Sequence, residues 1–216
     1  NYEKETILKE QATIYFLVNQ SNIRTTEKSD DDILKLKEFA KNGYKTHSIE
    51  IMSYASPEGS VERNDKVSDK RMKSTVKYTK HLLKKLNVEG ANNSELYTET
   101  SVGEDWVGFE SIIQQSEMKD KRKISNILNT IDDVEKREEQ LRDMTEIYDA
   151  VKDDILPQLR KANIIIRAYE PKKTDEEINK LSLENPTELD LEEILYSTSL
   201  TKSEEEKIKI LKSAIE

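Results

Sequence analysis

Residues 49–86 read IEIMSYASPEGSVERNDKVSDKRMKSTVKYTKHLLKKL, and the organisation of the whole chain can be worked out from them. Ile49 and Ile51 alternate with Glu50 and Met52, which is typical of a β-strand with one buried face. Ser-Pro-Glu-Gly then breaks the strand, because proline fixes φ and glycine tolerates a turn. Apolar residues next recur at helical spacing, which predicts a long helix whose buried stripe is formed by Met72, Val76, Thr79, Leu83 and Leu86.

Polar residues gather where this predicted strand meets the predicted helix. Asn64 and Arg71 are seven residues apart, so about two helical turns separate them on nearly the same side of the helix. Strand–loop–helix junctions that carry polar groups are common locations for ligand sites. The sequence therefore predicts a binding site at this junction.

The same residues resemble the OmpA-like C-terminal domain, the module by which many Gram-negative envelope proteins hold peptidoglycan. The usual pattern of that family is a strand, then T-D-x-x-G, then N-x-x-L-S-x-x-R-A. The residues at matching spacing are Gly59, Asn64, Val67, Ser68 and Arg71. The aspartate of the family, fifteen residues before the arginine, falls on Ser56, which is a departure from the pattern.

The resemblance implies that Arg71 binds the carboxylate of the diaminopimelate side chain in the peptidoglycan stem peptide. A guanidinium suits this role, because its planar fork can form two parallel hydrogen bonds to a carboxylate. The structural alternative is a helix-surface arginine paired with Asp69 or another acidic neighbour. Asn64 would donate either to the same ligand or, as residues at helix starts usually do, to the turn at 56–59.

Ser56 weakens the implied pocket, because a hydroxyl cannot supply the charge that pairs with the ammonium group of the ligand. Losing a charge-assisted contact of about 1.5–3 kcal/mol corresponds to roughly tenfold to hundredfold weaker binding at that group. Glu58, two residues further on, is the candidate to compensate. The candidate ligand-binding residues are therefore Arg71, Asn64, Ser56, Glu58 and Ser68.

The other segments extend this unit to an α+β fold. A central strand is predicted over 14–18, preceded by an edge strand within residues 1–10, and further strands are predicted over 95–100 and 162–169. Ser29 and the acids after it open another helix. The expected architecture is an OmpA-like β-α-β-α-β-(helical insert)-β sandwich, with helices packed on a mixed four-stranded sheet.

The connection before the last strand is much longer than in the resembled family. Residues 106–160 have three apolar helical faces and are interpreted as a helical insert, in which Trp106 and Phe109 anchor a helix on the core. G-E-D-W-x-G and I-L-P-x-L-R-x-A resemble an OmpA-related subgroup found in Bacteroidetes envelope proteins. We assign residues 1–170 to the OmpA-like domain.

Residues 171–216 differ in character from the domain. From Glu170 onward, thirteen acids face only seven lysines, so most of the negative charge of the chain is in this tail. Capped helix starts are predicted at Thr174 and Asp190. The apolar pattern of residues 189–216 predicts two antiparallel helices, a C-terminal hairpin that resembles one tetratricopeptide-type unit. A single such unit is too short to be stable alone, which favours docking on the domain or continuation of the repeat.

Composition excludes several classes of function. The chain has 216 residues, a net charge of −9, no cysteine and two histidines without a ligand-spaced partner, so we predict no metal, no cofactor and no thiol chemistry. No apolar run is long enough to span a bilayer as a helix. The helix at 60–86 carries nine lysines or arginines against three acids, but only Tyr78 is interleaved as a stacking aromatic, which favours a solvated basic face over nucleic-acid binding.

Two hypotheses for the function follow. In the first, the chain is a non-catalytic periplasmic domain, associated with the outer membrane, that binds peptidoglycan and tethers a larger envelope protein. In the second, the OmpA-like frame is kept but the ligand site is degenerate, and the domain is a scaffold for protein–protein interaction with envelope partners. No nucleophile motif or glycine-rich phosphate loop supports an enzyme.

Overall fold

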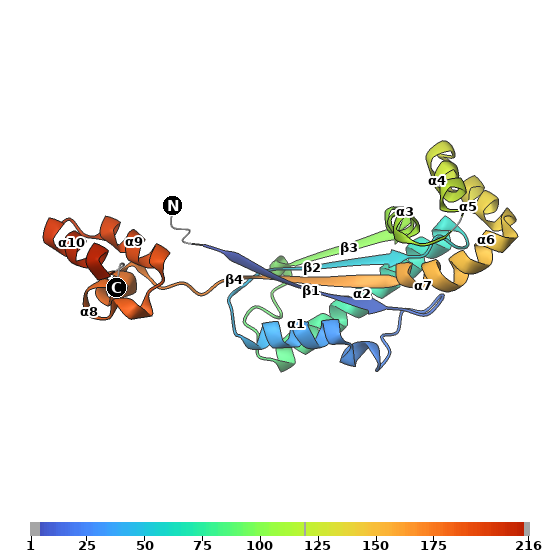
Figure 1. Ribbon diagram of the computed structural model, residues 1–216. Helices are drawn as coiled ribbons and strands as arrows, with labels where there is room; N and C mark the ends of the chain where they lie inside the picture. The colour runs from blue at the N-terminus through green and yellow to red at the C-terminus, as the bar shows by residue number, and fades with distance from the viewer. Residues whose placement is uncertain (1–4, 119, 214–216) are drawn as a thin grey trace. The chain divides into compact units, whose positions relative to one another are not determined.

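The fold is α+β, with helices packed on a mixed four-stranded sheet, as the sequence predicts. A computed structural model describes residues 5–118 and 120–213 (Figure 1). The strands are β1 (Ile7–Tyr15), β2 (Thr46–Ala55), β3 (Tyr97–Glu104) and β4 (Lys161–Tyr169), in the sheet order β1-β4-β2-β3. β2 pairs in parallel with β3 and antiparallel with β4.

The first strand differs from the prediction in both extent and position. β1 ends at Tyr15, so the apolar residues Leu17 and Val18 lie beyond it and are half exposed. β1 is also an edge strand rather than a central one. The apolar run from Ile14 to Val18 was misleading because only Ile14 and Phe16 are buried, and the chain leaves the strand after Tyr15, so that residues 16–18 belong to a loop.

Two helices cover one face of the sheet, α1 (Asp31–Lys41) and α2 (Val61–Lys85) (Figure 1). The N-cap of α1 is Asp30 rather than Ser29, and its carboxylate accepts a hydrogen bond from the Asp32 amide. Ile49 and Ile51 of β2 meet these helices across the main core, as the alternation predicts. The other core residues are Ala12, Ile14, Phe16, Ile33, Leu36, Ala40, Val76, Leu83, Ala91, Ala162, Ile164 and Ile166.

The predicted insert is helical. It comprises α3 (Trp106–Gln115), α4 (Lys121–Thr130), α5 (Val134–Asp143), α6 (Thr145–Ala150), a π-helical turn (Val151–Ile155) and α7 (Leu156–Leu159). Phe109, Ile113, Ile124, Leu141, Val151, Ile155, Leu156 and Leu159 form a core of its own. The π-helical turn ends two residues before Pro157, whose missing N–H removes one donor from the helical hydrogen-bond ladder.

The chain divides into two compact units, one formed by Lys9–Ala168 and the other by Asn1–Leu8 together with Tyr169–Glu216. The second unit contains α8 (Asp175–Glu184), α9 (Leu191–Leu200) and α10 (Glu204–Ser213) around Ile178, Leu189, Ile194 and Ile210. The predicted hairpin corresponds to α9 and α10. The predicted helix start at Thr174 is confirmed as the N-cap of α8, a third helix that begins at a capping box formed by Thr174 and Glu177.

Short 3₁₀ helices at Glu27–Ser29, Ser94–Leu96 and Pro186–Glu188 complete the described elements. Within the described ranges, no helix is both long and apolar enough to cross a membrane.

Candidate functional site

The predicted junction is a loop, residues 56–60, that connects β2 to α2. Gly59 has φ +93°, a conformation that side chains with a Cβ rarely adopt. The Glu58 amide donates to the Ser56 carbonyl over 2.8 Å, so the turn is tight. The Ser56 hydroxyl donates to Glu58 Oε1, also at 2.8 Å, and Ser56 is only 4% exposed. Two of the predicted residues therefore bind each other inside the loop.

Arg160, the residue just before β4, completes this loop. Its Nη2 lies 2.8 Å from Glu58 Oε1, and its Nε donates to the same oxygen over 3.0 Å. The Nε is also 3.4 Å from Ser56 Oγ. Glu58 does not replace the missing acid of an open pocket, because its carboxylate is already neutralised by Arg160. Arg160 is the arginine of the I-L-P-x-L-R-x-A run, but it was not predicted as a site residue, because its partner Glu58 is 102 residues away in the sequence.

Arg71 is buried, with 1% of its surface exposed, and its guanidinium binds main-chain carbonyls. Nη1 donates to Tyr54 O over 2.8 Å, Nε to Gln20 O over 3.0 Å and Nη2 to Leu17 O over 3.2 Å. The same group lies 5.3 Å from the centre of the Phe16 ring. Arg71 thus ties the end of β2 to the loop that follows β1.

The structure corrects the idea of a surface arginine paired with Asp69, since the Asp69 carboxylate instead binds Lys73 at 2.7 Å. Burial lowers the pKa of Arg71 well below its ordinary value, to about 10; the charge of Arg160 adds to this lowering and Glu58 opposes it. At neutral pH the guanidinium therefore keeps its charge, and the three carbonyls stabilise it in place of a ligand carboxylate.

Asn64, on the first turn of α2, joins the loop to the end of β3. Its Nδ2 donates to Glu58 O over 3.2 Å and to Glu104 Oε1 over 2.7 Å. Glu104 Oε2 in turn accepts a 2.9 Å hydrogen bond from the indole nitrogen of Trp106, the first residue of α3. The side-chain amide therefore serves the turn, and it connects that turn to the start of the insert.

Ser68 lies away from the loop, fully buried between α2 and the sheet. Its hydroxyl donates to Ser53 O over 2.9 Å, while the Ser53 hydroxyl donates to Ser68 O over 2.7 Å. The Ser101 hydroxyl and the Gly103 amide both donate to Ser68 Oγ. This network is internal and fixes α2 against β2 and β3. The structure brings Ser56, Glu58 and Asn64 into contact with one another, whereas the hydrogen bonds of Arg71 and Ser68 go to other partners.

The insert packs over the same loop and encloses a small cavity. The cavity measures about 10 Å³, room for about one water molecule, and is lined by Pro57, Glu58, Phe109, Glu138, Leu141, Arg142, Tyr148, Val151 and Leu156. Figure 1 shows α5, α6 and α7 at the end of the sheet where β2 leads into α2. A ligand the size of a stem peptide does not fit this cavity.

Glu138 of α5 is the most perturbed carboxyl group at this contact. It is 8% exposed, and burial raises its pKa from the ordinary 4.5 to about 7. The negative charges of Glu104 and Glu58 add to the rise, while Arg142, whose Nη2 is 3.1 Å from Glu138 Oε2, opposes it. Within the described part of the chain, Oε1 has no hydrogen-bond partner. Glu138 was not predicted, because its perturbation depends on contacts made across the insert.

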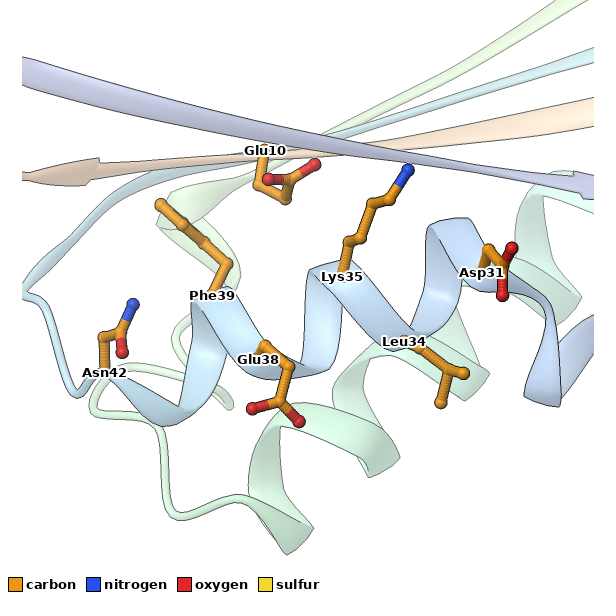
Figure 2. Close-up of a pocket in the computed structure, with 7 residues that line it drawn as sticks. All are labelled: Glu10, Asp31, Leu34, Lys35, Glu38, Phe39 and Asn42. Carbon is orange, nitrogen blue, oxygen red and sulfur yellow. The ribbon is translucent and has the colours of Figure 1, made fainter.

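Open grooves occur elsewhere in the domain. One groove, of about 520 Å³, lies between α1 and β1 and is lined by Glu10, Asp31, Leu34, Lys35, Glu38, Phe39 and Asn42. Figure 2 shows Lys35 and Phe39 rising from α1 toward the strand that carries Glu10. Its charges are of mixed sign, and Glu38 is already paired with Lys41 at 2.6 Å. Three of its lining residues are acidic and only Lys35 is basic, so this groove does not favour an anionic ligand.

No family model matches the chain, and a search of curated proteins found no match. No group of three or more histidine, aspartate or glutamate side chains in the described residues is arranged to hold a metal ion.

Proposed function

We propose that this chain is a non-catalytic OmpA-like scaffold of the cell envelope. The residues at the positions of the family's peptidoglycan site bind one another and the main chain instead of a ligand. The observation that carries the proposal is the state of Arg71. Its guanidinium is buried and already binds three carbonyls, so a ligand carboxylate would have to displace them.

The loop and the insert support the same proposal. Ser56 and Glu58 bind Arg160 rather than facing solvent, and Asn64 connects the loop to Glu104. The insert covers the loop and leaves only the small cavity at Pro57 and Glu138. A domain with this arrangement would act by presenting surfaces to other envelope proteins, in the periplasm and near the outer membrane.

Peptidoglycan binding is the competing proposal. It is favoured by the spacing of Gly59, Asn64, Ser68 and Arg71, and by the pKa of about 10 that keeps Arg71 positively charged at neutral pH. It requires the loop at 56–60 to open and Arg160 to leave Glu58. Tethering of a larger outer-membrane-associated protein to the cell wall would then be the function.

A titration with a diaminopimelate-containing muropeptide separates the two proposals. The ¹⁵N-labelled chain is compared with Ser56→Asp, which restores the acid of the family pattern, and with Arg160→Gln, which frees Glu58. We expect no saturable shift changes for residues 54–71 in the unmodified chain at about 1 mM ligand. Saturable changes there, strengthened by Ser56→Asp, would overturn the scaffold proposal in favour of peptidoglycan binding.

A further inference from the structure

A second groove lies on the solvent side of α2, away from the loop at 56–60. Its volume is about 290 Å³, close to the lower end of small-ligand sites. It is lined by Ile23, Lys28, Ser74, Lys77, Tyr78 and His81. Ser74, Lys77, Tyr78 and His81 recur at spacings of three and four residues and therefore share one face of the helix.

The floor of this groove is apolar and held in place. Ile23 and Tyr78 are both partly buried and pack against the main core. Burial also raises the pKa of the Tyr78 hydroxyl, so this group is a neutral hydrogen-bond donor at physiological pH. The floor can therefore contact an apolar or aromatic group without reorganising the fold.

The rim of the groove is cationic. Lys28 and Lys77 are exposed, and none of the six lining residues is acidic. The ammonium of Lys37 donates to the main-chain carbonyl of Lys28 over 2.7 Å, which places a further positive charge close by. Like charges that converge on one groove raise the local concentration of anions.

Lys28, which precedes α1, and Lys77 of α2 differ from three other lysines of α2. Lys66, Lys73 and Lys80 form ion pairs with Glu62, Asp69 and Glu99, respectively. For Lys28 and Lys77, the described residues provide no carboxylate within salt-bridge distance. Their charges are therefore compensated by solvent, which a bound anion can replace.

We propose that this groove binds a small organic phosphate, with the phosphate between Lys28 and Lys77 and its apolar or aromatic body on Ile23 and Tyr78. Phosphate fits better than carboxylate because no planar arginine fork lines the groove, and lysine binds phosphate as a point charge. Ser74 and His81 add donors from the same face of α2. The site is independent of the proposed scaffold function, since it shares no residue with the contacts among Ser56, Glu58 and Arg160.

The test is a titration of the ¹⁵N-labelled chain with three probes: phenyl phosphate, inorganic phosphate and phenol. We expect saturable shift changes with phenyl phosphate at Lys28, Ser74, Lys77, Tyr78 and His81. Inorganic phosphate should bind about tenfold more weakly, since it lacks the ring, and phenol should not saturate below about 10 mM. Absence of saturation by phenyl phosphate up to the same concentration would overturn the proposal.

Charge variants distinguish a defined binding site in the groove from a general attraction of the anion to the basic surface of α2. The double variant Lys28→Gln, Lys77→Gln should weaken phenyl phosphate binding at least about tenfold. The matched control Lys70→Gln, Lys84→Gln removes two exposed lysines of α2 that do not line the groove and should leave binding within about twofold. Equal weakening of phenyl phosphate binding by the two double variants would show attraction to the whole basic helix and would contradict a specific binding site in the groove.

A vesicle sedimentation experiment distinguishes the two possible sources of the phosphate, a soluble ligand and a lipid headgroup. Vesicles of phosphatidylglycerol and phosphatidylcholine are sedimented with the chain and with both double variants. Sedimentation lost only in Lys28→Gln, Lys77→Gln would support the groove with a lipid phosphate as its source. No sedimentation, together with phenyl phosphate binding, would support a soluble ligand. Sedimentation lost equally in both double variants would contradict the proposal.

Discussion

The guanidinium of Arg71 is buried and binds three main-chain carbonyls. A buried guanidinium must have its donors satisfied, and here Tyr54, Gln20 and Leu17 supply carbonyl oxygens. Replacement of the arginine would remove the charge and leave these carbonyls unpaired at the same time. Its contribution is therefore to stability, through the contact between the end of β2 and the loop after β1.

We predict that Arg71→Met lowers the free energy of unfolding by about 3 kcal/mol or more. The matched control is Lys73→Met on the exposed part of the same helix, where the ion pair with Asp69 is solvated and the expected loss is below about 1 kcal/mol. Urea denaturation followed by circular dichroism measures both. Equal losses in the two variants would mean that the buried guanidinium does not hold the loop.

At the scale of elements, the contact between α5 of the insert and the loop at 56–60 contains the carboxyl group of Glu138, whose charged form is disfavoured by burial. Glu138 is buried beside Glu58 and Glu104, and its pKa is about 7 in the folded chain against an ordinary 4.5. The folded state therefore binds more protons than the unfolded state between these two values. Stability must fall as pH rises from about 4.5 to about 7, because the buried carboxyl is forced to ionise.

Glu138→Gln should remove this part of the pH dependence, since glutamine stays neutral. We expect the variant to be more stable than the unmodified chain at pH 8, by at most about 3 kcal/mol, and to differ little at pH 4. Thermal unfolding at a series of pH values measures the difference. Glu139→Gln on the same helix, at an exposed position whose charge does not contribute to the pKa shift of Glu138, is the control and should leave the pH profile unchanged. A Glu138→Gln profile parallel to that of the unmodified chain would contradict the assignment.

The type of an element was predictable where the apolar residues followed one repeat, either the alternation of a strand or the spacing of a helix. The alternation at 49–55 and the apolar stripe of α2 correspond to β2 and to a helix over Val61–Lys85. The extent of β1 was not predictable from Ile14–Val18, because apolar residues in a loop and in a strand look the same without knowledge of their neighbours. The third helix of the tail, α8, begins at a recognisable capping box but was not counted in the hairpin.

At the scale of the whole molecule, the two compact units have separate hydrophobic cores. The unit Lys9–Ala168 contains the main core and the core of the insert, whereas α8, α9 and α10 surround Ile178 and Ile210. The cores of the first unit lie entirely within it, so its stability should not require the C-terminal helices.

A chain that ends at Glu170 should therefore keep the fold of the first unit. We expect its amide spectrum over residues 9–168 to match that of the full chain, and its melting temperature to change by no more than about 4 °C. A second chain that ends at Asn163 is the control; it lacks most of β4, which lies between β1 and β2, and should lose the dispersed spectrum. Loss of dispersion in the chain that ends at Glu170 would contradict the independence of this unit.

The strand–loop–helix at 49–86, the α+β class and the presence of a helical insert follow from local patterns, because hydrophobic periodicity and turn residues act over a few neighbours. The chemistry at the junction does not follow from such patterns. A guanidinium can bind a ligand carboxylate or main-chain carbonyls, and a carboxylate can face solvent or an arginine. Arg71 meets Leu17 across 54 residues and Glu58 meets Arg160 across 102, so the tertiary structure alone selects these partners and closes the loop that the sequence presented as a binding site.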